Sequence, residues 1–163
     1  MEARHLKIPP PPAEANGYLL SHAALLLSSY RRWTGEELLP AEDPQDIGRR
    51  LWEAPFAVLS HGLGPDPIFN YGNATALRLF DYHWHAFTRL PSRLSAEPVN
   101  QEERARLLEQ VRRDGYSRGY RGVRISADGR RFRIANAVVW NLVDERGDYQ
   151  GQAASFDRWE FLA

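Results

Sequence analysis

The stretch "DPIFNYGNATALRLF", residues 66–80, joins a short aromatic strand to the start of a helix. Residues 68–71 predict a strand because β-branched and aromatic side chains gather there between turn-forming residues. Gly72 then allows a sharp turn, and Asn73 is of a type that accepts hydrogen bonds from free backbone N–H groups at a helix start. A turn with a helix cap explains this junction without a ligand, and contact of Asn70 or Asn73 with a ligand is the alternative.

The composition of the whole chain excludes several classes of site. The chain has 163 residues, of which 43% are hydrophobic and 26% charged, as is ordinary for one globular domain. The 21 Lys and Arg residues balance the 21 Asp and Glu residues, so no net charge favours nucleic acid or a membrane surface. The chain has no cysteine, which excludes disulfides, thiolate catalysis and thiolate metal sites.

The amino-terminal third predicts a lead and a helical extension. No apolar run approaches the ~20 residues of a membrane span, and the prolines at 9–12 interrupt the order of a signal peptide, so we expect a cytoplasmic protein. Residues 1–12 predict a flexible, proline-rich lead. Residues 13–55 predict an N-terminal helical extension, with helices over 13–34 and 43–54.

The first of these helices carries one apolar stripe at steps of three and four residues. The stripe consists of Leu19, Ala23, Leu26, Leu27 and Tyr30. It must be buried on the rest of the chain or on a second copy. A homodimer through the N-terminal helix is therefore one expected arrangement.

Residues 56–163 predict the folded body, in which two short strands precede two helices and three further strands. The predicted strands are 56–60, 68–71, 120–126, 130–143 and 150–156, and the predicted helices are 73–88 and 100–114. Asn100 and Glu103 have the spacing of a capping box at the start of the second helix. This order predicts an α+β fold with a five-stranded antiparallel sheet and helices on one face.

The longest predicted strand, 130–143, alternates apolar and polar residues. Strand geometry places alternate side chains on one face. The face expected to be buried consists of Phe132, Ile134, Asn136, Val138, Trp140 and Leu142.

Four segments together resemble the MEKHLA domain, a family related to PAS domains. They are "SHGLGPDPIFNYGNATAL" (60–77), "LPSRLSAEP" (90–98), "GYRGVRISADGRRF" (119–132) and "VVWNLVDERGDYQGQAASF" (138–156). The resemblance covers roughly residues 18–157, without homeodomain or zipper heptads, as in the stand-alone bacterial type. It implies a PAS-like domain over 56–163 with a sensory or interaction role, and it supplies no ligand or catalytic residue.

The histidines do not predict a metal site. His83 and His85 lie two residues apart, so on a helix they point roughly 200° away from each other and cannot bind one ion. Haem-binding PAS domains generally use a histidine on the helix before the third strand, and residues 100–114 contain none. The light-sensing relatives use a cysteine for flavin photochemistry, and this chain has none. The missing histidine and cysteine disfavour haem and cysteinyl flavin as cofactors. Noncovalent flavin or another small molecule remains a candidate ligand.

Arginines are the most informative polar residues. If Val123 and Ile125 are buried, Arg124 lies on the outer face of its strand and pairs with a carboxylate. In the alternative, Arg124 or Arg93 lies in a pocket, where a buried guanidinium needs an anionic partner such as a ligand carboxylate.

Further ligand-contacting candidates follow from the predicted strands and the first helix of the body. Gln152 is an amide in an otherwise apolar strand, and Trp140 and Phe132 are expected to form the apolar wall of a pocket. The full set of candidate ligand-binding residues is Asn70, Tyr71, Asn73, Trp84, Arg93, Arg124, Trp140 and Gln152.

We identify no catalytic constellation, and the function expected is a noncatalytic sensory or interaction module. It would bind a small molecule or a protein partner and signal through dimerisation or through another protein. One alternative is an enzyme with a polar cavity around His61, His83 and Arg124. Another is a structural homodimer whose core is filled with side chains.

Overall fold

The computed structural model of the chain describes residues 10–40 and 42–163. Most of the lead predicted over 1–12 lies outside the described residues. At its end, Asn16 Nδ2 donates a hydrogen bond of 2.9 Å to the Pro11 carbonyl, and Pro12 is buried. The last residues of the predicted lead are therefore held against the fold.

The predicted five-stranded antiparallel sheet is confirmed, with the strand order β2-β1-β5-β4-β3. The strands are β1 (Ala57–His61), β2 (Phe69–Gly72), β3 (Tyr116–Ile125), β4 (Arg131–Val143) and β5 (Tyr149–Phe156). A short sixth strand, β6 (Arg158–Phe161), follows β5 and pairs with the first part of β4. The tail therefore extends the sheet in addition to packing against it.

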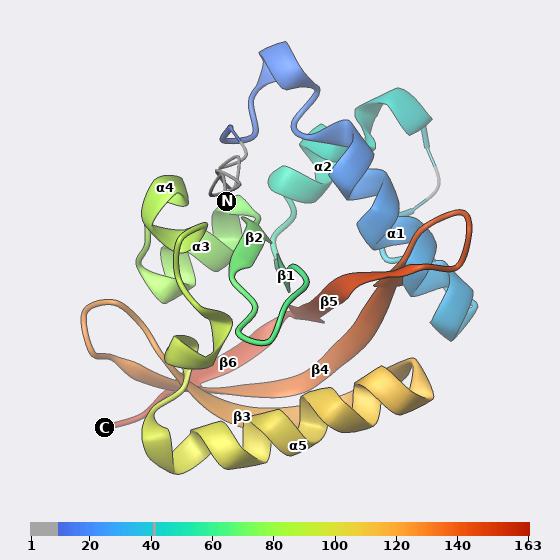
Figure 1. Ribbon diagram of the computed structural model, residues 1–163. Coiled ribbons are helices and arrows are strands. Elements are labelled where there is room, and N and C mark those ends of the chain that lie inside the picture. Colours follow the sequence, from blue (N-terminus) through green and yellow to red (C-terminus); the bar gives the residue numbers. More distant parts are fainter. Residues whose placement is uncertain (1–9, 41) are drawn as a thin grey trace, which may run out of the picture.

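Helices cover both faces of the sheet (Figure 1). One face is covered by α3 (Ala74–Phe80), α4 (Trp84–Phe87) and α5 (Pro98–Asp114), and the other by α1 (Leu20–Thr34) and α2 (Ile47–Trp52). Short 3-10 turns lie at Glu14–Asn16, Pro44–Asp46 and Ser92–Ser95.

The helix predicted over 73–88 is wrong as one element, because it breaks after α3. Asp81 has a left-handed backbone with φ of 59° and ends α3. The chain restarts as α4 at Trp84, so His83 precedes the helix instead of lying on it.

The predicted starts of α1 and α5 are also corrected. Tyr18 and Leu19 have positive φ, so α1 begins at Leu20 and not near 13. Pro98 occupies the first turn of α5, where its missing N–H and fixed φ are tolerated. Asn100 therefore lies inside the helix, and the predicted capping box does not form.

A β-bulge in β4 overturns the predicted alternation of that strand. Tyr120 pairs with Ala137, and Gly122 pairs with Ile134. On β3 one residue, Arg121, lies between the two pairs, whereas on β4 two residues, Ala135 and Asn136, lie between them. Asn136 takes the extra position with φ of 53° and is exposed. The side chains beyond the bulge change face, as expected where one residue is inserted into a pleated strand.

The sheet consequently has a separate apolar core on each face. Phe132, Ile134 and Val139 belong to the core under α3 and α5. Trp140 and Leu142 belong to the core under α1 and α2. The predicted common wall of Phe132 and Trp140 does not exist, because the bulge separates them onto opposite faces.

The apolar stripe of α1 is buried largely on the chain's own sheet. Ala23, Leu26 and Tyr30 are buried in the second core. The rings of Tyr30 and Trp140 meet edge to face at 5.1 Å, and Trp140 Nε1 donates a hydrogen bond of 3.2 Å to the Leu26 carbonyl. The inner face of α1 therefore has its partner within the chain.

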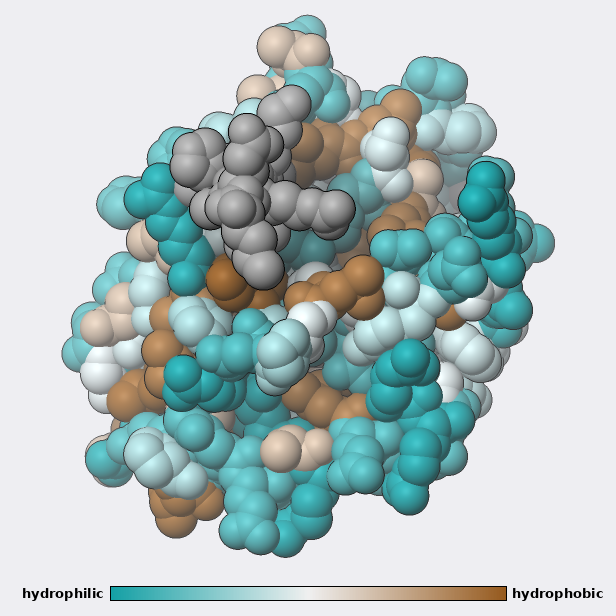
Figure 2. Space-filling model, viewed as in Figure 1, coloured by the Kyte–Doolittle hydropathy of each residue, from teal (hydrophilic) through white to brown (hydrophobic). Residues whose placement is uncertain are grey.

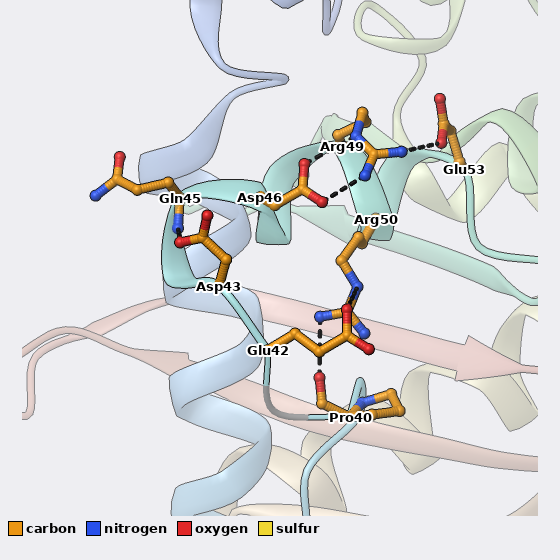
Figure 3. Close-up of polar contacts among 8 residues, drawn as sticks. All are labelled: Pro40, Glu42, Asp43, Gln45, Asp46, Arg49, Arg50 and Glu53. Carbon is orange, nitrogen blue, oxygen red and sulfur yellow. Dashed lines mark hydrogen bonds and ion pairs between the residues drawn. The ribbon is translucent and has the colours of Figure 1, made fainter.

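Polar contacts fasten the segment that leads into α2 (Figure 3). Arg49 pairs with Asp46 and with Glu53, and its Nη1 lies 2.9 Å from Glu53 Oε2. Arg50 donates a hydrogen bond of 2.9 Å to the Pro40 carbonyl. Since most of these groups are exposed, their contribution is to set the path of the chain more than to stabilise the fold.

Hydrophilic residues cover most of the face shown in Figure 2, and hydrophobic ones appear in small groups among them. Within residues 10–40 and 42–163, no helix is both long enough and apolar enough to span a membrane.

Candidate functional site

A cavity of about 60 Å³ lies between α5 and the sheet. The cavity is therefore small and has room for only a few waters. Its walls are mostly apolar. The apolar wall includes Leu59, Phe69, Phe80, Leu107, Leu108, Ile134, Val139, Ala154 and Phe156, and the polar lining includes His61, Ser95, Arg104, Tyr120, Arg124 and Gln152.

Of the residues predicted to bind a ligand, only Arg124 and Gln152 line this cavity. Tyr71, Trp84 and Trp140 belong to the core on the opposite face of the sheet. Their aromatic rings pack against α1, α2 and one another, so the structure does not bring them to the cavity.

Arg93 and Asn70 also lie outside the cavity. Arg93 is half exposed and pairs with Asp66, with Nε 3.0 Å from the carboxylate oxygen Oδ1. Asn70 Oδ1 accepts a hydrogen bond of 2.6 Å from Ser60, which also contacts His22 Nε2 at 2.9 Å. The expectation that Arg93 lies in a pocket is therefore wrong, because it has a carboxylate partner at the surface.

Asn73 caps α3, as expected from its position, and its side chain is fully buried. Its Oδ1 accepts hydrogen bonds from the backbone N–H groups of Ala76 and Val58. Its Nδ2 donates to the carbonyls of Leu51 and Phe56. The backbone therefore uses both N–H donors and the acceptor oxygen of the Asn73 side chain. The residue stabilises the junction between β2 and α3, and its amide has no group left for a ligand.

Arg124 is buried on the inner face of β3 and not on the outer face. Arg124 pairs with Phe132, whose side chain is fully buried, so both side chains lie on the inner face of the sheet, where Arg124 lines the cavity. Val123 and Ile125 are only half-buried on the other side. The first expectation for Arg124 therefore fails, because Val123 and Ile125 are not the buried pair.

Sequence reasoning missed Arg104 as a site residue. It lies on α5 and is buried beside Leu107 and Val111, one helical turn or two away. Burial is the main cause that lowers the pKa of Arg104 to about 10, with the charge of Arg124 adding to the decrease and Tyr120 opposing it. The sequence did contain a signal for the burial of Arg104, because an arginine at helical spacing from two apolar residues lies on the buried face of its helix.

His61 presents an unused acceptor in the cavity. Its Nδ1 lies 3.2 Å from the Gly62 carbonyl, which can only accept, so Nδ1 carries the proton. Its Nε2 is buried and has no hydrogen-bond partner among the described residues. Burial is the main cause that lowers the pKa of His61 to about 4, with Arg104 adding to the decrease and the Gly62 carbonyl and Gln152 opposing it.

Gln152 and Asn141 connect the sheet to α5. Gln152 Nε2 donates to the Leu108 carbonyl at 2.9 Å and to Asn141 Oδ1 at 3.1 Å. Asn141 Nδ2 donates to the Val111 carbonyl at 2.9 Å. These amides hold α5 over the cavity.

The structure brings together only part of the enzyme alternative. His61 and Arg124 line the cavity, whereas His83 is exposed at the start of α4. Among the residues that the structure describes, no group of three His, Asp or Glu residues is placed to hold a metal ion.

Sequence comparison identifies relatives over most of the chain. Residues 20–161 match the MEKHLA domain. The chain is 27% identical over 144 residues to the homeobox-leucine zipper protein HOX29 of Oryza sativa subsp. japonica, and 21% identical over 142 residues to ATHB-15 of Arabidopsis thaliana. The alignments cover 84% and 86% of this chain but only 16% and 17% of those proteins. No comparison tests the stand-alone bacterial type, which stays a prediction.

Solved structures similar to this one include PAS and light-oxygen-voltage domains. A PAS domain from Colwellia psychrerythraea matches with a TM-score of 0.57 and 16% identity, covering 66% of this chain and 88% of that one. The light-state dimer of the fungal blue-light photoreceptor Vivid matches with a TM-score of 0.58 and 15% identity, covering 93% and 98%. The chain therefore belongs to the MEKHLA domain family, and its fold is PAS-like.

Proposed function

We propose that this domain is a noncatalytic sensory or interaction module that binds a small molecule in the cavity under α5. The observation that carries the proposal is the cavity itself, which has apolar walls and a few convergent polar groups. Binding sites for small molecules generally have this character. The binding face is the one covered by α3, α4 and α5, and the opposite face is filled by the core under α1.

The chemistry of the cavity supports binding more than catalysis. A general base works best with a pKa near the operating pH. The pKa of His61 is lowered to about 4, mainly by burial, so this imidazole is a weak base at neutral pH. Its Nε2 has no hydrogen-bond partner among the described residues, so it activates neither Ser60 nor Ser95 of the lining.

The cavity does not fit a flavin. Pockets for cofactors and drug-sized ligands occupy about 300–1,000 Å³, whereas this cavity measures about 60 Å³. A much smaller ligand is therefore expected.

A cavity-filling substitution tests the proposal. Ala154→Leu adds three carbons to the cavity wall, while Ala105→Leu adds the same group on the exposed surface of α5. We expect native mass spectrometry of the purified protein to show a bound small molecule in the wild type and in Ala105→Leu. Ala154→Leu should lose it while keeping its circular dichroism spectrum. A wild-type protein that carries no small molecule and binds none from a cell extract would contradict the proposal.

We also propose a homodimer through the outer face of α1. The observation that favours it is that the similarity to Vivid, whose structure is a light-state dimer, covers 93% of this chain. Ala24 is exposed on this face, and an open groove beside it is lined by Leu27, Leu39 and Ile47. Sedimentation at micromolar concentration should give a dimer that Ala24→Glu dissociates. A strict monomer for the wild type would overturn this proposal and leave ligand binding untouched.

A further inference from the structure

We propose that the ligand of this cavity is a short-chain carboxylate whose head group is bound by Arg104 and Arg124. The inference rests on the proposed function, since it assumes that the cavity binds a small molecule. Two guanidinium groups from different elements, α5 and β3, line one small cavity. Both residues are buried, with exposed fractions of 8% and 7%.

Arg104 has no carboxylate partner among the described residues. Its Nη2 donates one hydrogen bond of 2.8 Å to Ser92 Oγ, which is a neutral acceptor. A guanidinium has five N–H donors, so most of its donors remain for another acceptor. A buried charge is costly unless it is paired and hydrogen-bonded, and a second cation nearby increases the cost. The site is therefore built for an anion.

Within the part of the chain that the structure describes, Arg124 reaches a carboxylate only through Tyr120. Its Nη2 donates to Tyr120 Oη at 3.0 Å, and Tyr120 in turn donates to Glu103 Oε2 at 2.9 Å. Its Nη1 donates to the Val123 carbonyl at 2.9 Å. These bonds fix the guanidinium without giving it a direct carboxylate partner. An arriving carboxylate would thus meet a positioned donor.

The rest of the cavity determines the class of anion. The apolar wall is incompatible with a fully hydrated inorganic ion and suits a hydrocarbon chain. A volume of about 60 Å³ is far below the roughly 300–1,000 Å³ of pockets for drug-sized ligands, so only a small acid fits. A carboxylate of three or four carbons would place its head on the arginines and its chain against the apolar wall.

His61 adds a preference within this class. Its unpartnered Nε2 accepts hydrogen bonds, and it lines the same cavity as the two arginines. A ligand hydroxyl would satisfy this nitrogen, whereas an unsubstituted chain would leave it unpaired. A hydroxylated short-chain acid should therefore bind more tightly than its unsubstituted counterpart.

The test uses three probes of similar size, propionate, lactate and propionamide, in NMR titrations of the full chain. We expect propionate and lactate to bind with dissociation constants of about 1 mM or tighter. Lactate should bind more tightly than propionate, and propionamide at least about tenfold more weakly than either, because its neutral amide cannot form an ion pair with the guanidinium groups. Chemical-shift changes should appear at residues lining the cavity.

Arg104→Met tests the role of the arginine, with Arg106→Met as its control on the same helix. Arg106 is exposed and pairs with Glu102. Arg104→Met should weaken propionate binding at least about tenfold, while Arg106→Met should leave it unchanged. Without a ligand, Arg104→Met should raise the melting temperature by about 2–4 °C, because it removes an unpaired buried charge. Should Arg104→Met not fold, Arg124→Met and the three probes on the wild type carry the test.

The outcomes separate this inference from the proposed function. Equal binding of propionate and propionamide would overturn the carboxylate inference and leave a small-molecule site. Undiminished propionate binding in Arg104→Met and Arg124→Met would overturn it as well. If no probe binds the wild type while a neutral molecule co-purifies with it, the inference fails and the proposed function stands. If no molecule of any kind binds the cavity, both fail.

Discussion

Asn73→Ala should lower the free energy of unfolding by about 3 kcal/mol or more. The substitution removes one amide that serves four backbone groups, two N–H donors and two carbonyl acceptors. Each buried polar group left unpaired costs about 1–3 kcal/mol, and loss of a helix cap alone costs about 1 kcal/mol. The side chain has no exposed surface, so water does not replace these bonds without a rearrangement of the junction.

Urea denaturation of Asn73→Ala measures this effect, and Asn100→Ala is the matched control. Asn100 lies inside α5 and does not cap the helix, so its replacement should change stability by less than about 0.5 kcal/mol. Similar losses for the two variants would contradict the role assigned to Asn73. A normal urea slope for both would show that the comparison concerns stability and not a change in the unfolded state.

The second large effect is a loss of stability in mildly acidic solution. Burial lowers the pKa of His22 to about 4, and burial is also the main cause that lowers the pKa of His61 to about 4. In the unfolded chain both imidazoles titrate near 6.5. Between these values the unfolded chain binds protons that the folded chain does not, so stability is present above pH 6.5 and is lost as the pH falls toward 4. The two residues together should cost about 4 kcal/mol between pH 7 and pH 5.

Unfolding of single variants at pH 7 and pH 5 assigns this loss to its residues. His22→Gln and His61→Gln should each remove about half of the difference between the two pH values. His85→Gln should retain all of it, because His85 is exposed. Equal stability of the wild type at both pH values would rule out buried neutral histidines as the cause.

The sequence predicted those parts of the fold that depend on local rules. The cap at Asn73, the turn after β2 and the five strands follow from residue types and spacing that act over a few positions. The bulge at Asn136 was not predictable in this way, because the apolar alternation of β4 continues through it. Only the pairing with β3 shows that one residue is extra. The break at Asp81 is similar, since an aspartate with a left-handed backbone leaves the helical spacing of apolar residues intact.

The restriction to local patterns also explains which site residues were predicted from the sequence. Arg124 was one of two pocket arginines considered, and its position depended on which side of an edge strand is covered. Trp140 and Phe132 share a face by simple alternation, but the bulge separates them. Arg104 follows helical spacing onto the buried face, yet an arginine on such a line is usually interpreted as covering the core with its stem. Its approach to Arg124 depends on how α5 crosses the sheet, which no local pattern encodes.

The bulge in β4 also constrains how the family can vary in length. Because the strand changes phase at Asn136, its first half contributes to the cavity wall and Trp140 in its second half seats α1. An insertion or deletion of one residue between Phe132 and Val139 would invert one half of the strand and expose a core to water. Relatives should therefore tolerate added or missing residues in the turn at 144–148 and keep a constant count across the bulge.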